Sequence, residues 1–147
     1  MFSRCVAIVT HNSLEAMPKR KKMKILLVED IRVERAIYKK WLEELGCEVI
    51  EASNGNEGLD LYYDHRPELV ISDIIMPEKD GVQMLIELQR EHNGAVKTFA
   101  ISGAGEEPGE YLPLMQNLGV LRTFIKPVEK DDLLAAVKEC FLDPTQD

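Results

Sequence analysis

The stretch Lys24-Ile-Leu-Leu-Val28, followed directly by Glu29 and Asp30, decides the fold that we expect for this chain of 147 residues. A short, continuous apolar run is typical of a strand that is buried on both faces of a parallel sheet. The two acidic residues come where this strand ends, and parallel sheets bind ligands at the carboxyl ends of their strands. The stretch therefore predicts a buried strand that brings two carboxylates to a binding edge.

The residues that follow change to a helical period. Apolar side chains recur at every fourth position, at Val33, Ile37, Trp41 and Leu45. We expect this stripe to belong to the core, with Gly46 as the C-terminal cap of the helix. A buried strand followed by an amphipathic helix begins the alternation that builds a parallel sheet.

The same alternation continues to the end of the chain. Further apolar runs predict strands over residues 47–52, 69–73, 96–101 and 121–125. Helices are expected from Asn54-Gly55 to just before Pro67, over 82–91, over 111–118, and from a cap at Asp131 or Asp132 to Phe141. Five strands alternating with five helices predict an α/β fold with a doubly wound parallel sheet. The strand order 2-1-3-4-5 would make the first and third strands neighbours.

Length and composition bound the domain organisation. The chain is long enough for one domain with its own core and too short for two. We expect that domain over residues 24–142, an N-terminal extension of unknown role over 1–23 and a tail over 143–147. No apolar run approaches the roughly 20 residues that a membrane span needs. The three cysteines lie far apart and form no metal or disulfide motif, which favours a cytoplasmic protein.

The net charge of −8 is unevenly distributed along the chain. Residues 1–24 hold six basic side chains and one acidic side chain, whereas the remainder holds 12 basic and 25 acidic ones. So acidic a body repels the phosphates of nucleic acids, and direct nucleic-acid binding is not expected. Acidic sites do suit hard cations such as Mg²⁺.

Polar side chains gather at the predicted strand ends. Glu29 and Asp30 end the first strand, Asp73 the third, Ser102 the fourth and Lys126 the fifth. Because these strand ends share one edge of the sheet, we expect three carboxylates, a hydroxyl and an ammonium in one cleft. Carboxylates that lie so close destabilise one another unless a cation is present. The pattern predicts a site for a divalent metal with oxygen ligands.

Four motifs at these positions resemble the receiver domain of bacterial response regulators. They are Leu-Val-Glu29-Asp30, Ile-Ser-Asp73-Ile-Ile-Met-Pro77 with Asp80-Gly81 after it, Ala-Ile-Ser102-Gly-Ala, and Lys126-Pro127. The resemblance covers roughly residues 24–142 and implies a flavodoxin-like receiver fold. It also implies a signalling phosphoacceptor and no enzyme with turnover of a separate substrate. Asp73 would accept a phosphoryl group from a sensor histidine kinase or phosphotransfer protein, and a downstream protein partner or homodimer would receive the signal.

The resemblance assigns a metal site to this edge. Asp30, Asp73 and the backbone carbonyl of Ile75 would hold Mg²⁺ or Mn²⁺, and Glu29 would assist through water. The metal would neutralise the carboxylates and screen the charge of the incoming phosphoryl group.

Two further roles follow from the same resemblance. Lys126 would balance an oxygen of the phosphoryl group, and Ser102 would donate its hydroxyl to the group once it arrives. The Lys126–Pro127 peptide bond is expected to be cis, as it is in the family, although X-Pro bonds in general are cis in only about 5% of cases.

The chain departs from the family's pattern at two places. Receivers usually carry an aromatic residue three positions before the lysine, where this chain has Thr123; Phe124 comes one residue later and should face the other side of the strand. We therefore expect weaker or differently routed signalling to the surface of the last two strands and helices. Ile75 and Ala104, which flank the expected water path, are apolar and cannot orient water, so the phosphorylated state should be long-lived.

Local structural roles are also compatible with these residues. Glu29 and Asp30 could cap a helix, Asp73 could be a turn residue at a strand end, and Ser102 could serve its own loop. Lys126 could be an ordinary surface charge. None of these roles explains why all five residues fall at strand ends.

Two other functions also fit parts of the pattern. A degenerate receiver could act as a phosphorylation-independent binding scaffold, and Thr123 favours that reading. A phosphatase of the haloacid dehalogenase type also uses an aspartyl phosphate, but it carries the nucleophile on the first strand and an aspartate two residues later. Here Asp73 follows the predicted third strand, and Ile75 holds the later position.

Overall fold

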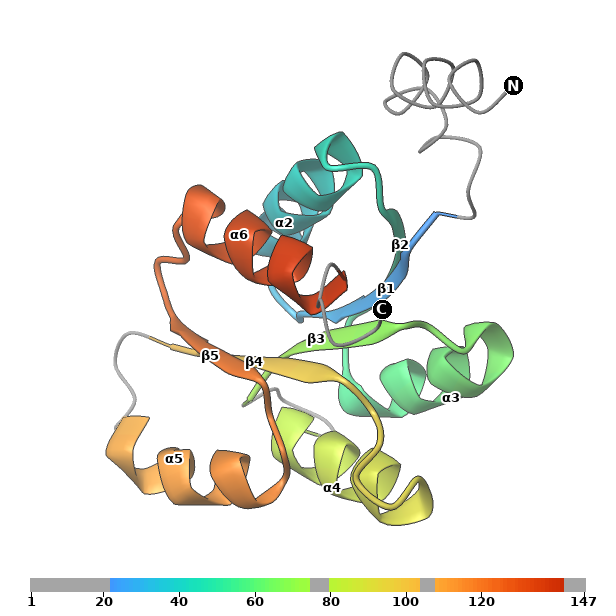
Figure 1. Ribbon diagram of the computed structural model, residues 1–147, viewed down its shortest axis with the longest axis vertical. Helices are drawn as coiled ribbons and strands as arrows, with labels where there is room; N and C mark the ends of the chain where they lie inside the picture. Colours follow the sequence, from blue (N-terminus) through green and yellow to red (C-terminus); the bar gives the residue numbers. More distant parts are fainter. Residues whose placement is uncertain (1–21, 75–79, 104–107, 142–147) are drawn as a thin grey trace, which may run out of the picture.

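The computed structural model describes residues 22–74, 80–103 and 108–141. Its centre is a five-stranded parallel sheet in the order β2-β1-β3-β4-β5 (Figure 1). The strands are β1 (Lys24–Val28), β2 (Glu48–Ala52), β3 (Leu69–Asp73), β4 (Thr98–Ser102) and β5 (Arg122–Ile125). The helices are α2 (Arg32–Glu44), α3 (Gly55–His65), α4 (Gly81–Glu91), α5 (Pro108–Asn117) and α6 (Lys130–Phe141). The predicted α/β fold and its strand order are confirmed.

Helices cover both faces of the sheet, with α2 and α6 on one face and α3, α4 and α5 on the other (Figure 1). Strand β1 shows why its run is continuously apolar. Ile25 and Leu27 point into the layer of α2 and α6, whereas Leu26 and Val28 point into the opposite layer. All four are fully buried, because successive side chains of a strand face opposite sides and both sides are covered.

Local capping sets where two of the helices begin. The Asn54 side chain accepts a hydrogen bond from the Glu57 N–H at the start of α3, and the Glu57 carboxylate accepts one from the Ser53 N–H. Asp80 caps α4 in the same way by accepting from the Gln83 N–H. These contacts satisfy N–H groups that have no partner within the helix, so the chain turns at these points.

Several element boundaries differ by one or more residues from those expected, and three of them bear on how the elements begin. Strand β4 begins at Thr98 and not at residue 96. Helix α5 begins at Pro108, three residues before the expected start, since proline fits the first helical turn. Helix α6 begins at Lys130, so Asp131 and Asp132 lie in its first turn and do not precede it. Acidic residues in that turn still interact favourably with the helix dipole.

The expected core stripe of α2 is wrong in its first half. The side chains of Val33 and Ile37 are 68% and 41% exposed, whereas Tyr38 and Leu42 are buried. A period of four residues advances about 40° too far at each step of a helix with 3.6 residues per turn. The stripe therefore winds around the helix, and only its last part, which begins at Trp41, packs against the core.

This correction predicts unequal stability effects along α2. Val33→Ser or Ile37→Ser should change the free energy of unfolding by no more than about 0.5 kcal/mol, because these side chains are largely exposed. Leu42→Ala should cost about 3 kcal/mol, because it empties a fully buried position. Urea denaturation of the three variants checks this ranking of their free energies of unfolding. A loss of about 2 kcal/mol or more for Val33→Ser, which is typical of a core truncation, would contradict it.

Within the described part of the chain, none of the helices is both long and apolar enough to cross a bilayer.

Candidate functional site

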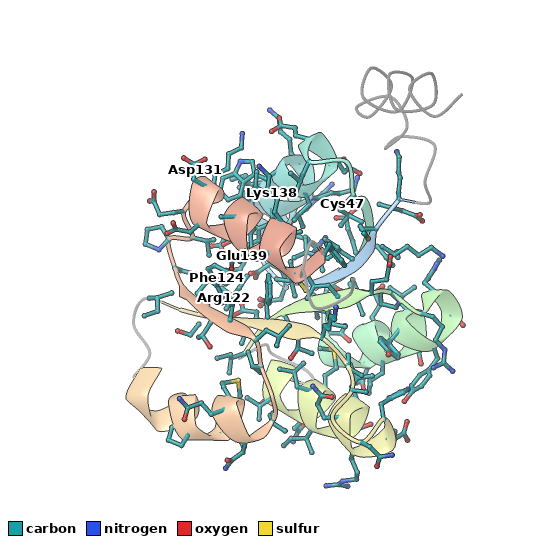
Figure 2. All side chains as sticks on the ribbon, in the orientation of Figure 1. Cys47, Arg122, Phe124, Asp131, Lys138 and Glu139 are labelled. Carbon is teal, nitrogen blue, oxygen red and sulfur yellow. The ribbon has the colours of Figure 1, made fainter. Side chains whose placement is uncertain are left out.

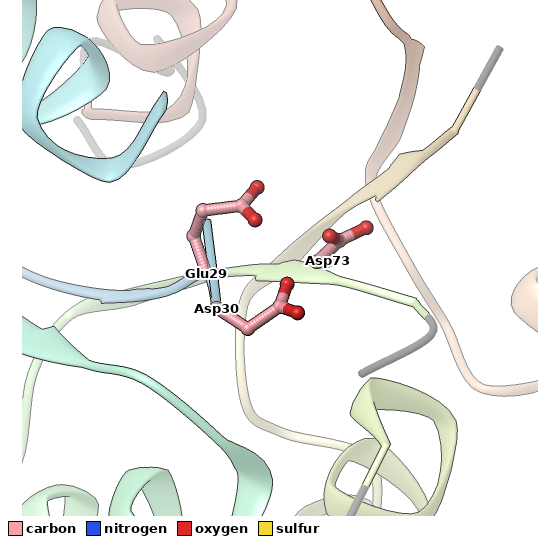
Figure 3. Close-up of side chains that lie close together, drawn as sticks. All are labelled: Glu29, Asp30 and Asp73. Atoms are coloured by element: carbon pink, nitrogen blue, oxygen red, sulfur yellow. The ribbon is translucent and has the colours of Figure 1, made fainter. Parts of the chain in front are cut away.

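Sheet register brings the three acidic residues together at the carboxyl edge. Val28 of β1 pairs with Ser72 of β3, so the next residues, Glu29 and Asp73, lie side by side. One carboxylate oxygen each from Glu29, Asp30 and Asp73 lies within 4.8 Å of the others, and the three groups face one another in Figure 3. The predicted convergence of three carboxylates is confirmed.

Lys126 reaches into this group from the end of β5. Its Nζ lies 3.1 Å from Asp73 Oδ2 and 3.2 Å from Glu29 Oε1. The Lys126 N–H donates to the Ser102 carbonyl at 2.9 Å, which ties the strand end to β4. The peptide bond to Pro127 is cis, as the resemblance implied. With only 14% of its side chain exposed, Lys126 is no ordinary surface lysine.

Glu34 is a further member of the site, and the pattern of polar residues at strand ends does not predict it. Its Oε1 lies 2.7 Å from Lys126 Nζ, which is closer than either of the other two carboxylates. The residue belongs to the first turn of α2, four positions after Asp30. Asp30 precedes the cap of α2, so helical spacing in the sequence provides no signal for Glu34.

The backbone around Asp73 holds its carboxylate in place. The Ile74 N–H donates to Asp73 Oδ1 at 3.0 Å, and the Ser72 hydroxyl donates to the Asp73 carbonyl at 2.8 Å. The Ile74 carbonyl accepts a hydrogen bond of 2.7 Å from the Gly81 N–H at the start of α4. These contacts orient the other oxygen, Oδ2, toward Lys126.

Burial makes negative charge costly at this edge. Glu29 is fully buried. Desolvation, with a smaller contribution from the Asp73 charge, raises its pKa from 4.5 to about 8. Burial also raises the pKa of Asp73, although Lys126 opposes this shift. For Lys126, burial alone would lower the pKa, but the carboxylates of Glu34, Asp73 and Glu29 raise it overall. Each carboxylate therefore gains from a nearby cation.

The donor set fits a hard divalent cation. Glu29, Asp30 and Asp73 offer carboxylate oxygens, which Mg²⁺ prefers, at distances that one ion can span. Glu29 Oε1 is buried and has no aligned hydrogen-bond donor among the described residues. The expected carbonyl ligand, Ile75, lies outside the described residues.

Helix capping does not account for the acid pair. The N-cap residue of α2 is Ile31, and its side chain makes no capping hydrogen bond. Glu29 Oε2 accepts from the Ile31 N–H at 3.0 Å, so one of its oxygens is held locally. Asp30 caps nothing at the start of α2 and contributes its carboxylate to the group with Asp73.

Ser102 ends β4, directly beside the strand that carries Asp73. It is 1% exposed, and its hydroxyl has no hydrogen-bond partner among the described residues. A buried hydroxyl without a partner costs free energy, so a local loop role is a poor explanation for this serine. Ala104, which was expected beside the water path, lies outside the described residues.

Thr123 and its aromatic neighbour Phe124, both in β5, have different surroundings. Thr123 is exposed, whereas Phe124 packs against the layer of α2 and α6, with its ring centroid 5.7 Å from that of Phe99 (Figure 2). Arg122 forms an ion pair with Glu139, which links β5 to α6 on the same side. The aromatic side chain of this strand therefore belongs to the core layer.

Comparisons with known proteins agree with this site. The family model described as response regulator receiver domain matches residues 25–138. The chain is 32% identical over 117 residues to the chemotaxis protein CheY of Bacillus subtilis, with 79% of this chain and 95% of that protein covered. It is also 32% identical over 122 residues to the probable C4-dicarboxylate response regulator DctR of the same organism, where it covers 82% of this chain and 53% of DctR.

Solved structures show the same likeness. The CheY-like response regulator receiver domain protein from Methanospirillum hungatei superposes with a TM-score of 0.77 at 26% identity. That comparison covers 86% of this chain and 100% of the other. The sheet order, the edge of three carboxylates and the lysine beside it agree with the resemblance found in the sequence. The chain belongs to the family of response regulator receiver domains.

Proposed function

We propose that this chain is a phosphoacceptor that takes a phosphoryl group onto Asp73 in a Mg²⁺-dependent reaction and thereby controls a protein partner. The observation that carries the proposal is the buried Asp73 carboxylate, which lies beside the Lys126 ammonium and close to the carboxylates of Glu29 and Asp30. A structural ion pair would need one acid beside the lysine. Two further acids gathered around this nucleophile favour phosphoryl chemistry with a metal.

The chemistry needs few groups. An oxygen of the Asp73 carboxylate forms a bond to phosphorus, while the bond from phosphorus to the donor nitrogen of a phosphohistidine breaks and the imidazole leaves with the electron pair. The Ile74 N–H holds one oxygen of Asp73, which leaves the other, beside Lys126, to bond to phosphorus. Lys126 offsets the charge on the transferred group.

Glu29, Asp30 and Asp73 would hold Mg²⁺ or Mn²⁺, together with the Ile75 carbonyl that the resemblance implies. The ion would supply positive charge for the developing phosphoryl oxygens. The buried Glu29 oxygen, which has no aligned donor among the described residues, supports that assignment, and a bound cation would offset the burial that raises the pKa of this group.

Ser102 would donate its hydroxyl to the bound phosphoryl group and draw the loop after β4 toward it. Its buried hydroxyl, which has no partner among the described residues, supports this role. The exposed Thr123 and the packed Phe124 support weaker coupling to the surface of β5. Because Ile75 and Ala104 are apolar, we expect a long-lived phosphorylated state, and a lifetime of seconds would contradict this.

The partners would be a sensor histidine kinase or phosphotransfer protein upstream and a protein partner or second copy downstream, in the cytoplasm. The relatives CheY, a chemotaxis protein, and DctR, a probable C4-dicarboxylate response regulator, belong to two different signalling contexts.

Incubation with acetyl phosphate and Mg²⁺ tests the proposal, with intact mass as the readout. We expect one added phosphoryl group on the wild type, none on Asp73→Asn and none in EDTA. Asp60→Asn changes an exposed aspartate of α3 and should be labelled like the wild type. An unlabelled wild type would overturn the proposal in favour of a binding scaffold, and turnover of a small phosphate ester would point to a phosphatase.

A further inference from the structure

Helix α2 supplies a fourth carboxylate to the site. Glu34 Oε1 lies 2.7 Å from Lys126 Nζ, and its side chain is 34% exposed. In the described part of the chain, Lys126 is the one cation within ion-pair distance of Glu34. Glu34 does not belong to the group of three acids that could share a metal ion.

Three carboxylate oxygens surround the Lys126 ammonium within ion-pair distance. Those of Glu34, Asp73 and Glu29 lie at 2.7, 3.1 and 3.2 Å from Nζ. Among the described residues, the Asp73 oxygen is the one of the three that also accepts a hydrogen bond from Lys126. An incoming phosphoryl oxygen must therefore compete with these carboxylates for the charge of Lys126.

We infer that Glu34 is a positioning residue that restrains Lys126 and thereby slows phosphoryl uptake at Asp73. The inference rests on the proposed phosphoryl transfer. A metal ion would share the charges of Glu29 and Asp73, whereas the Glu34 charge would stay with the lysine. Glu34 holds the ammonium toward α2 and adds a negative charge near the place where a phosphoryl dianion must settle.

The restraint acts on the uptake step. In uptake from acetyl phosphate, an Asp73 oxygen bonds to phosphorus while the bond to acetate breaks, and acetate leaves with the electron pair. Without the Glu34 charge, Lys126 is free to stabilise the phosphoryl oxygens in the transition state, so uptake becomes faster.

The test compares Glu34→Gln with the wild type in Mg²⁺ and acetyl phosphate, with the rates read by intact mass. We expect uptake to be about threefold to tenfold faster, an effect kept modest because the partial exposure of Glu34 screens its charge. Glu34→Asp, which keeps the charge on a shorter side chain, should fall between the two. Glu43→Gln removes a charge from the same helix, where exposed Glu43 pairs with half-buried Lys39, and should match the wild type.

A double-mutant cycle shows whether Glu34 acts through Lys126. Unfolding of the wild type, Glu34→Gln, Lys126→Gln and the double variant in EDTA should give non-additive changes, because both substitutions remove the same contact. Additive changes, or uptake by Glu34→Gln that is no faster than in the wild type, would overturn the inference while leaving the proposed function intact. A wild type that takes up no phosphoryl group would overturn both.

Discussion

Replacing Gly81 with alanine should destabilise the protein by about 3 kcal/mol or more, although the substitution adds a single methyl group. The added Cβ would lie 1.8 Å from the carbonyl oxygen of Asp73 and 2.8 Å from the Ser72 hydroxyl oxygen. Neither β3 nor α4 can yield easily, because the Gly81 N–H is also bonded to the Ile74 carbonyl. The glycine is therefore required for the close approach of α4 to the strand that carries Asp73.

Gly58→Ala is the matched control. Both glycines lie in helices, so the gain in helix propensity from alanine is shared and cancels from the comparison. At Gly58 the added Cβ would meet Met84 Sδ at 2.7 Å, and a methionine side chain can move aside. Urea denaturation should show a cost of about 1 kcal/mol for this variant. Equal destabilisation by the two substitutions would mean that the close contact between Gly81 and the Asp73 carbonyl leaves no room problem for alanine.

Replacing Lys126 with methionine should destabilise the metal-free protein by about 3 kcal/mol at pH 9, because Glu29 and Asp73 then stay buried without their cation. The loss should be smaller at pH 6. The folded-state pKa of Glu29, already raised from 4.5 to about 8, would rise further, so the folded protein holds a proton that the unfolded chain has released. Stability from such a group is present below the unfolded pKa and declines as the pH rises through the folded one.

Denaturation in EDTA at the two pH values measures this difference. Lys130→Met is the control, since Lys130 pairs with exposed Glu44 at 3.0 Å. This substitution should lower the free energy of unfolding by no more than about 0.5 kcal/mol at either pH. Added Mg²⁺ should recover part of the stability of Lys126→Met, because a ligand that binds the folded state alone stabilises it. A cost that is the same at both pH values and no larger than that of Lys130→Met would contradict the central role of this lysine.

Most of the site could be predicted because sheet geometry makes strand ends informative. An apolar run such as that of β1 fixes where its strand stops, so Glu29 and Asp30 fall at the edge without further information. Once the strands are parallel and ordered, Asp73 must lie beside them. Burial on both faces also explains why these runs are easy to recognise.

Helix phase was harder to predict. The stripe from Val33 to Leu45 has a period of four, and its drift around the helix could be resolved only by seeing which side faces the sheet. The same phase brings Glu34 and Tyr38 toward the carboxyl edge and the core. The clash that requires Gly81 depends on a distance between two elements, which no spacing in the sequence contains.

The identity of the phosphorylated residue is the most direct test of the proposed site. Borohydride reduces an aspartyl phosphate to homoserine, which peptide mass spectrometry can locate after the protein has been treated with acetyl phosphate and Mg²⁺. We predict homoserine at position 73 and nowhere else, and none when EDTA replaces Mg²⁺. Homoserine at another position, or phosphoryl uptake that leaves Asp73 unchanged, would contradict the account.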